Sequence, residues 1–269
     1  MSATLTDSDV LSGGKSSRQY LLSWNMQGSE SGDSIGKWSS LKSVLSKTKE
    51  IVACTLQEAG SYPTSPLEKV FTDFKGFGGK WVGAYVQKLD TSRYMVTYHC
   101  PWAKSDDGNL RCSLAFVLIG DFKNAELPRP ELVATGQAAR PMLGMVLDGV
   151  ALFTLHANSS QNASLSAKSL IGELIGKYNT WIVAGDYNCK QTEMTGDWYV
   201  RQPAASGVRL DQNFVQLASQ DIDYAIQTKR AQGNAVRLSQ HPGVLVGSGM
   251  LKSDHPATAF QIQTTKGQT

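Results

Sequence analysis

Apolar and polar residues along this chain form short apolar runs with polar ends, a pattern typical of buried β-strands. The first run covers residues 20–26 and the next covers residues 51–56. Between them, residues 34–49 place apolar side chains on one stripe of a helix, and Asp33 supplies an N-cap. The chain therefore begins with a predicted β-α-β unit, and polar residues stand where both strands end.

Short strands dominate the middle of the chain, after a loop rich in glycine and proline over residues 60–80. The pattern predicts them over 81–87, 93–99, 113–119, 131–135, 142–147 and 150–155. Gly108-Asn109 and Asp148-Gly149 are typical of turns between such strands. An amphipathic helix is expected over 165–178, and later strands are expected over 181–184, 222–226, 244–246 and 257–262.

No internal repeat, linker or low-complexity segment divides the chain. Residues 1–18 are polar and rich in serine and glycine, so we expect a mobile leader there and a single α/β domain over residues 19–269. No uncharged apolar run approaches the roughly 20 residues that a membrane helix needs. No apolar core of a signal peptide is visible, which leaves two alternatives, an intracellular protein or a mature form whose signal has been removed.

The charge of the chain is nearly balanced, with 26 Lys and Arg residues against 23 Asp and Glu residues. A net charge of +3 is too small to indicate nucleic-acid binding by itself, so any such contact has to come from local clusters. The composition also excludes a disordered protein, a coiled coil and a collagen-like chain.

The four cysteines form no C-x-x-C pair, which argues against a zinc site and favours thiols buried in the core. If one disulfide forms, Cys100 and Cys112 are the expected partners, because a hairpin can bring them together.

Polar residues stand at the ends of five predicted strands, which is more than helix caps and turns explain. These residues are Asn25, Gln57-Glu58, His156, Asp186-x-Asn188 and Ser253-Asp254-His255. Glu58, Asp254 and Asn25 offer the carboxylate and amide oxygens that a hard divalent ion needs. His156 and His255 offer proton carriers that titrate near neutral pH. Together they indicate a hydrolytic site.

Asp186 and Asn188 are two residues apart, so in extended backbone their side chains face the same way. An Asp that orients water beside an Asn that donates to an anionic oxygen suits phosphoryl transfer. Asp223 lies in an otherwise apolar strand, where it is either buried and paired with His255 or exposed at a sheet edge. His99 and His241 have no such context and are interpreted as structural.

Six motifs resemble, in order and spacing, the endonuclease/exonuclease/phosphatase superfamily from about residue 19 onward. They are S-W-N-M-Q-G at 23–28, L-Q-E-A-G at 56–60, F-T-L-H-A at 153–157, A-G-D-Y-N at 184–188, D-Y-A at 223–225 and S-D-H-P at 253–256. The pair W-N-M-Q-G and Q-E-A-G resembles more specifically the family of cytolethal distending toxin B subunits, which are relatives of deoxyribonuclease I. The segment 139–144 also resembles a signature of that family.

The resemblance implies a four-layer α/β sandwich, with two packed, mainly antiparallel sheets flanked by helices. It implies a DNase that hydrolyses phosphodiester bonds in DNA with Mg²⁺, or with Mn²⁺ in its place, as the active subunit of a genotoxin. The implied partners are DNA and the delivery or binding subunits of a toxin complex. The implied place of action is the nucleus of a target cell.

The resemblance also assigns roles to individual residues. Glu58 would bind the metal, with Asn25 and Asp254 beside it. His156 and His255 would be the paired histidines, with Asp223 orienting His255. Asp186 and Asn188 would position the nucleophilic water and the phosphate, and Arg111 would contact the scissile phosphate. Arg140 would hold the DNA backbone and Asn25 would also bind substrate. For both arginines, the residues alone leave a solvated surface charge as the alternative.

The chain departs from the family pattern in places. Cys189-Lys190 follows Asp186-x-Asn188 where the family often has an Arg, so a charge remains but the bidentate fork is lost. No carboxylate between Lys80 and Thr97 clearly matches the family partner of the first histidine. Residues 190–220 are also hard to align.

Two other functions stay open at the level of sequence. One is a phosphatase of the same superfamily that acts on phosphoinositides or another small phosphate ester. The other is a non-catalytic binding module that retains the fold. The presence of all the acidic and histidine positions argues against the binding module.

Overall fold

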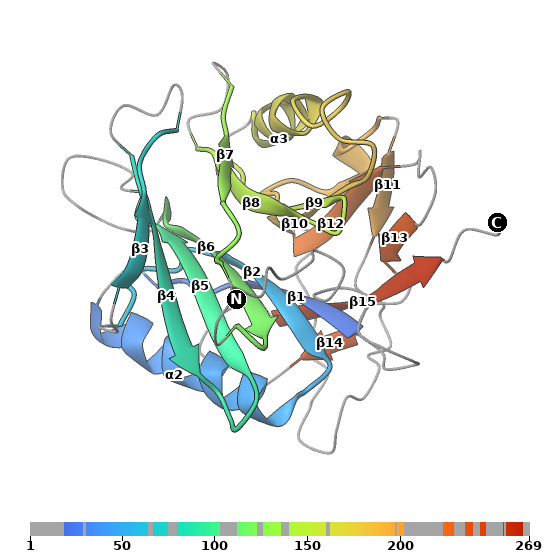
Figure 1. The fold of residues 1–269 in the computed structure, drawn as a ribbon. Helices are drawn as coiled ribbons and strands as arrows, with labels where there is room; N and C mark the ends of the chain where they lie inside the picture. The colour runs from blue at the N-terminus through green and yellow to red at the C-terminus, as the bar shows by residue number, and fades with distance from the viewer. Residues whose placement is uncertain are drawn as a thin grey trace.

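Two β-sheets pack face to face, and one helix covers the outer face of each, as Figure 1 shows. The computed structural model describes residues 19–28, 31–63, 67–74, 80–102, 112–122, 126–135, 140–159, 162–196, 198–201, 223–228, 235–238, 243–245, 255 and 257–265. The order of layers is α2, first sheet, second sheet, α3, which confirms the predicted four-layer sandwich. The expected leader over residues 1–18 lies outside the described residues. Within them, no helix has the length and apolar character to cross a membrane.

The first sheet has the strand order β13-β15-β1-β2-β6-β5-β4-β3, with β14 also pairing to β15. Its strands are β1 (Gln19–Asn25), β2 (Ile51–Gln57), β3 (Leu67–Phe71), β4 (Val82–Lys88), β5 (Tyr94–Cys100), β6 (Leu114–Gly120), β13 (Ala235–Leu238), β14 (Gly243–Leu245) and β15 (Ala257–Thr265). Helix α2 (Ser31–Lys47) connects β1 to β2, and the two strands are therefore parallel.

The second sheet has the strand order β11-β12-β10-β9-β8-β7. Its strands are β7 (Glu131–Val133), β8 (Met142–Leu147), β9 (Val150–His156), β10 (Trp181–Asp186), β11 (Trp198–Arg201) and β12 (Asp223–Thr228). Helix α3 (Ala163–Gly172) connects β9 to β10, which are also parallel, and a short 3₁₀ helix follows at Gln191–Glu193. Each sheet thus has one parallel pair among the described strands, and each pair lies near the centre of its own sheet.

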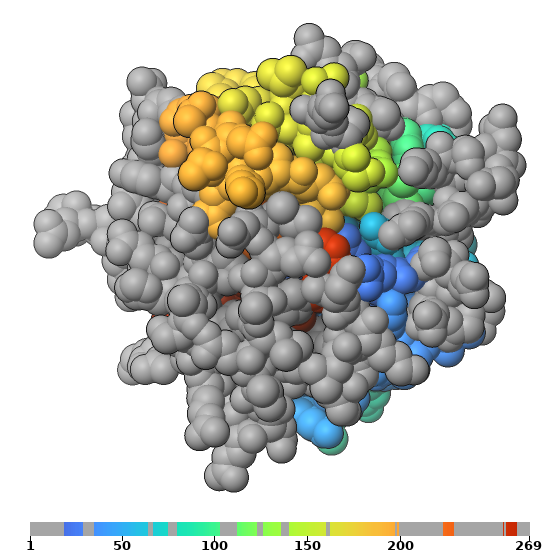
Figure 2. All heavy atoms as spheres, turned by 180° about the vertical axis from the view of Figure 1, so that it is seen from behind, coloured from blue at the N-terminus to red at the C-terminus, as the bar shows by residue number. Residues whose placement is uncertain are grey.

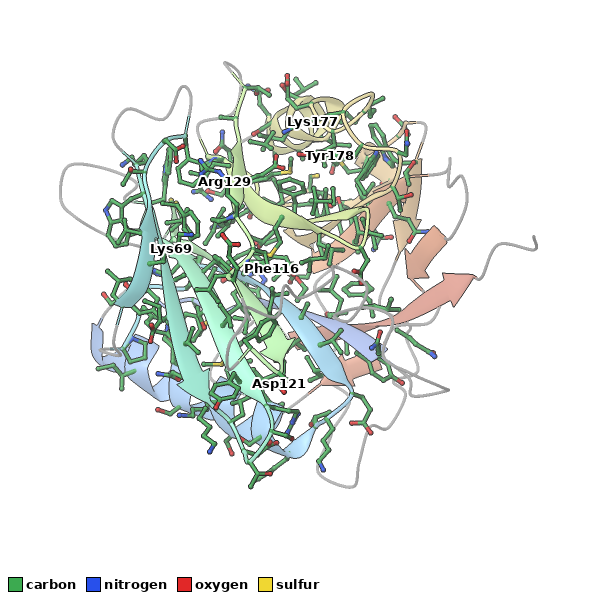
Figure 3. The ribbon with its side chains drawn as sticks, viewed as in Figure 1. Lys69, Phe116, Asp121, Arg129, Lys177 and Tyr178 are labelled. Atoms are coloured by element: carbon green, nitrogen blue, oxygen red, sulfur yellow. The ribbon has the colours of Figure 1, made fainter. Side chains whose placement is uncertain are left out.

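Three apolar layers hold the sandwich together. The central layer lies between the sheets, and Phe116, labelled in Figure 3, is one of its fully buried members. The second layer joins α2 to the first sheet through Trp38, Leu41 and Leu45, the stripe expected from the sequence. The third joins α3 to the second sheet. Apolar burial of this kind is the main favourable contribution to the free energy of folding.

The four cysteines are buried, as the interpretation of core thiols expected, and Cys100 is a free thiol, so the alternative of a Cys100–Cys112 disulfide does not hold. Cys100 ends β5 opposite Leu114 and points into the layer between the sheets, whereas Cys112 precedes β6 outside that layer. Burial raises the pKa of the Cys100 thiol to about 12, so this group behaves as an apolar core atom.

Each predicted strand is observed, with small shifts at the ends, whereas β3, β11 and β13 were not predicted. The prediction over 142–147 is the observed β8, and Asp148-Gly149 forms the expected turn with both residues at positive φ. Three predictions are wrong in part. Asp33 was expected to cap a helix over 34–49, but α2 begins at Ser31 and includes Asp33. The loop 60–80 contains β3, and the helix expected over 165–178 ends at Gly172, where the N–H groups of residues 173–175 bond three residues back instead of four. The expected Gly108-Asn109 turn lies outside the described residues.

Gly185 in β10 provides a test of how closely the two parallel strands of the second sheet approach. A Cβ atom at Gly185 would lie 2.0 Å from the carbonyl oxygen of Leu155 in β9. We expect Gly185→Ala to lower the free energy of unfolding by about 2 kcal/mol or more, because the backbone has to shift. Gly172→Ala is the matched control, since a Cβ there meets nothing within 4 Å. Urea unfolding of both variants measures the effect, and equal stabilities would show that β9 and β10 are not this close.

Candidate active site

The two parallel pairs bring the carboxyl ends of four strands to one place. In the first sheet, Asn25 ends β1 beside Gln57 of β2, and Glu58 follows directly. In the second sheet, Asp186 ends β10 beside His156 of β9. Asp223 begins β12 and lies opposite Asp186 in an antiparallel pair. Strand pairing therefore gathers three polar side chains at the end of each sheet.

A hydrogen bond between the sheets joins the two halves of this cluster. The Asn25 Nδ2 atom donates to Asp186 Oδ2 over 2.9 Å, and both residues are buried. The other amide atom, Asn25 Oδ1, accepts from the backbone N–H of Gln27 at 3.0 Å. On the far side, Asp186 Oδ1 accepts from the backbone N–H of Asn188 at 2.8 Å. Asn25 and Asp186 are thus each fixed on two sides.

His156 lies between carboxylates from both sheets. Its Nε2 atom is 3.6 Å from Glu58 Oε1 and 3.9 Å from Asp186 Oδ2. Glu58 has a left-handed backbone with φ of 46°, which is uncommon for a residue with a side chain. The sequence identified no carboxylate neighbour for His156 within 80–97, and the structure places Glu58 and Asp186 next to it.

His255 pairs with Asp223. Its Nδ1 atom lies 2.7 Å from Asp223 Oδ2 and 4.0 Å from Asp186 Oδ2. Asp223 is only 5% exposed, so the alternative of an exposed edge carboxylate does not hold. The short contact fixes the imidazole ring, and with Nδ1–H donated to Asp223 the Nε2 atom is left to exchange a proton.

Burial, together with the negative charge of Asp223, raises the pKa of Asp186 to about 6. The neighbouring His255, the N–H of Asn188 and the amide of Asn25 act in the opposite direction. A carboxyl group that titrates near neutral pH is suited to accept a proton and release it again.

Asn188 and Arg140 meet at the backbone of Ala157. Asn188 Nδ2 donates to the Ala157 carbonyl over 2.9 Å, and Arg140 Nη1 donates to the same oxygen over 3.0 Å. Asn188 also has a left-handed backbone with φ of 50°, a conformation that Asn adopts more readily than most residues. These contacts place the Arg140 guanidinium directly beside the cluster. Arg111 and Asp254 lie outside the described residues.

Figure 2 shows where these parts of the chain reach the surface. Blue atoms of the N-terminal part, yellow-green and orange atoms of the middle part and red atoms of the C-terminal part meet on this face. The site thus combines segments that are far apart in sequence.

Comparison with known proteins agrees with this geometry. No protein-family model matches the chain. The chain is 26% identical over 251 residues to a homolog of the cytolethal distending toxin B subunit from Salmonella typhi, and the match covers 89% of this chain and 88% of the relative. It is 23% identical over 251 residues to the corresponding toxin chain of Escherichia coli, covering 87% and 88% of the two chains.

Solved structures of cytolethal distending toxins have the same fold as this chain. The cytolethal distending toxin of Haemophilus ducreyi matches with a TM-score of 0.64 and 21% identity, over 90% of this chain and 97% of that chain. The toxin of Actinobacillus actinomycetemcomitans matches with a TM-score of 0.65 and 20% identity, over 90% and 97%. This chain has a deoxyribonuclease I-like fold. Its sequence resembles cytolethal distending toxin B subunits over most of its length, as the motifs predicted.

The donor set of this site fits a hard divalent cation. The ligand atoms of Asp186, Asp223 and His255 all lie within 4.8 Å of one another. Glu58 adds a third buried carboxylate, and carboxylate oxygens are the preferred ligands of Mg²⁺ and Mn²⁺. The resemblance assigned the metal to Glu58 and Asp254. Asp186, Asp223 and His255 form a second set of possible donors, to which the sequence analysis assigned other roles.

One contact of the site was missed by the sequence analysis. Gln57 Nε2 donates to Thr154 Oγ1 over 2.8 Å and connects the sheets directly beneath Glu58 and His156. The signal was present in the sequence, because Thr154 is a polar residue inside an apolar strand, two positions before His156.

His99 is buried outside this cluster, as the structural interpretation expected, but it supports the loop after Glu58. Its Nε2 atom lies 2.8 Å from the Gly60 carbonyl, so this nitrogen carries the hydrogen. Burial lowers the pKa of His99 from 6.5 to about 4, although the bond to Gly60 acts against the shift.

A depressed His pKa means that folding favours the neutral ring. Stability from His99 is therefore complete above pH 6.5 and is lost as the pH falls toward about 4. The loss should total about 3 kcal/mol, since one pKa unit corresponds to about 1.4 kcal/mol. His99→Gln keeps a donor for Gly60 but does not titrate. Urea unfolding of both proteins between pH 7 and pH 4 should show a steeper decline for the wild type, and parallel curves would contradict this account.

Proposed function

We propose that this chain is a metal-dependent endonuclease that hydrolyses phosphodiester bonds in DNA, acting as the active subunit of a genotoxin. The observation that carries the proposal is the Asp223–His255 pair, which lies beside Asp186 and completes an acid–base group at the junction of the sheets. The fold and the resemblance to toxin B subunits support the choice of DNA as substrate. By the same resemblance, delivery subunits are its partners and the target-cell nucleus is its place of action.

The metal in this proposal is held by Glu58 and Asp254, with Asn25 beside it. When bound, Mg²⁺ or Mn²⁺ neutralises charge on the phosphate and polarises its oxygens. Asn25 retains its bond to Asp186, so the residues from the first sheet stay in register with those of the second.

Water attacks phosphorus and one bond from phosphorus to a deoxyribose oxygen breaks. Asp186 orients the water, and His255 accepts its proton at Nε2 while Nδ1–H stays bound to Asp223. His156 supplies a proton to the leaving oxygen. Asn188 Nδ2 has two hydrogens, so one remains for a phosphate oxygen while the other binds Ala157. Arg111 stabilises the charge that develops on the scissile phosphate, and Arg140 binds the DNA backbone beside it.

Metal dependence and substrate class are tested together. Nicking of supercoiled plasmid should require Mg²⁺ or Mn²⁺, stop in EDTA and return when the metal is restored, because hard oxygen ligands bind the ion. Glu58→Gln should need a higher metal concentration. A parallel assay measures phosphate release from phosphoinositide vesicles. Intact plasmid together with released lipid phosphate would show that the chain is a phosphatase, and full nicking in EDTA would refute the metal assignment.

The histidines are tested by substitution. His156→Ala and His255→Ala should each lower the rate of nicking by about 100-fold or more, as expected for the loss of a positioned acid or base. His99→Gln is the matched control, since this histidine is equally buried but lies away from the acid–base group. His241→Ala should also retain activity. Rates unchanged in His156→Ala and His255→Ala would show that these histidines are not the acid and base, and a wild type that does not nick DNA would favour the non-catalytic binding module.

A further inference from the structure

The backbone segments that carry Asn25 and Glu58 are held in an unusual conformation. Gln27 and Glu58 have φ of 48° and 46°, in the left-handed region that is unfavourable for residues with a side chain. Such residues persist only where surrounding contacts hold them. The question for this site is which contacts supply that restraint.

The two segments are bonded to each other. The N–H of Met26 donates to the Gln57 carbonyl over 2.8 Å, and the N–H of Gly28 donates to the Glu58 carbonyl over 2.7 Å. These bonds extend the pairing of β1 and β2 beyond the ends of both strands. Displacement of one segment therefore moves the other, and Asn25 and Glu58 shift together.

Two consecutive residues of α2 reach these segments, one each. Lys37 Nζ donates to the Gln27 carbonyl over 3.0 Å, and Trp38 Nε1 donates to the Ala59 carbonyl over 3.1 Å. Lys37 is only 3% exposed, which is rare for lysine and requires polar partners. Trp38 is 2% exposed and is anchored in the layer between α2 and the first sheet.

We propose that Lys37 and Trp38 are positioning residues that hold Asn25 and Glu58 in place through the backbone of the two segments. The inference rests on the proposed function only for its effect on metal and activity. The restraint itself is independent of that function. Neither residue is placed in contact with metal or substrate. Each acts from the outer side of the first sheet, as groups behind metal ligands commonly do.

The restraint is tested by hydrogen exchange on the full chain without metal or DNA. In Lys37→Met, the amides of Met26, Gly28 and Ala59 should exchange about tenfold faster, because local opening of the segments becomes easier. The amide of Ala151, which donates to the Thr180 carbonyl in the second sheet, should be unchanged. Lys37→Arg retains a donor and should restore protection. Lys47→Met is the matched control, since Lys47 is exposed at the end of the same helix.

Metal binding is measured on the same variants by the electron paramagnetic resonance of Mn²⁺, without DNA. Lys37→Met should bind Mn²⁺ about tenfold more weakly, as for the loss of a group that orients metal ligands. Nicking by this variant should recover at high Mg²⁺ concentration, so the change lies in metal requirement more than in turnover. Lys37→Arg and Lys47→Met should behave as wild type.

The outcomes separate the two proposals. Unchanged exchange in Lys37→Met, or an equal change in Lys47→Met, would overturn the positioning role. Faster exchange in a chain whose wild type neither binds Mn²⁺ nor nicks DNA would leave the positioning role intact and remove the proposed function. If Lys37→Met does not fold, Trp38→Phe applies the same test, because Phe keeps an aromatic ring in the core and removes the donor to Ala59.

Discussion

The hydrogen bond from Asn25 to Asp186 is the contact on which the arrangement of the site depends. It joins the end of β1 in one sheet to the end of β10 in the other, at a point where both side chains are buried. A buried carboxylate needs hydrogen-bond donors, and Asp186 takes them from both sheets. The relative position of the two sheets is thereby fixed at the candidate site, while the apolar layer between them is less specific.

Negative charge is concentrated at this point, which lowers the stability of the folded chain. Glu58, Asp186 and Asp223 are all largely buried, and the two histidines are the described basic side chains that lie within 4.0 Å of them. Close carboxylates repel each other, which adds to the effect of burial in raising the pKa of Asp186. A divalent cation relieves this repulsion, so the same feature that strains the protein favours binding of a metal.

Much of the fold was predictable because its strands are short apolar runs with polar ends, as β8 illustrates. The end of α3 was not predictable, because the apolar pattern continues beyond Gly172 while the backbone there changes to bonds that run three residues back. The polar residues at the ends of predicted strands also included Asn25, Glu58, His156 and Asp186. The distances between these residues depend on the pairing of β1 with β2 and of β9 with β10. Periodicity does not encode such long-range pairing, and the proposed roles of Arg111 and Asp254 remain predictions.

The C-terminal strand β15 lies beside the first strand, β1, with Gln19 opposite Ile262. His255 lies just before β15, so one side of the site comes from a segment far along the chain from Asn25 and Glu58. Contacts between such distant segments form late, because a long loop has to close first. A chain that lacks β15 and the residues just before it would therefore lack the assembled centre.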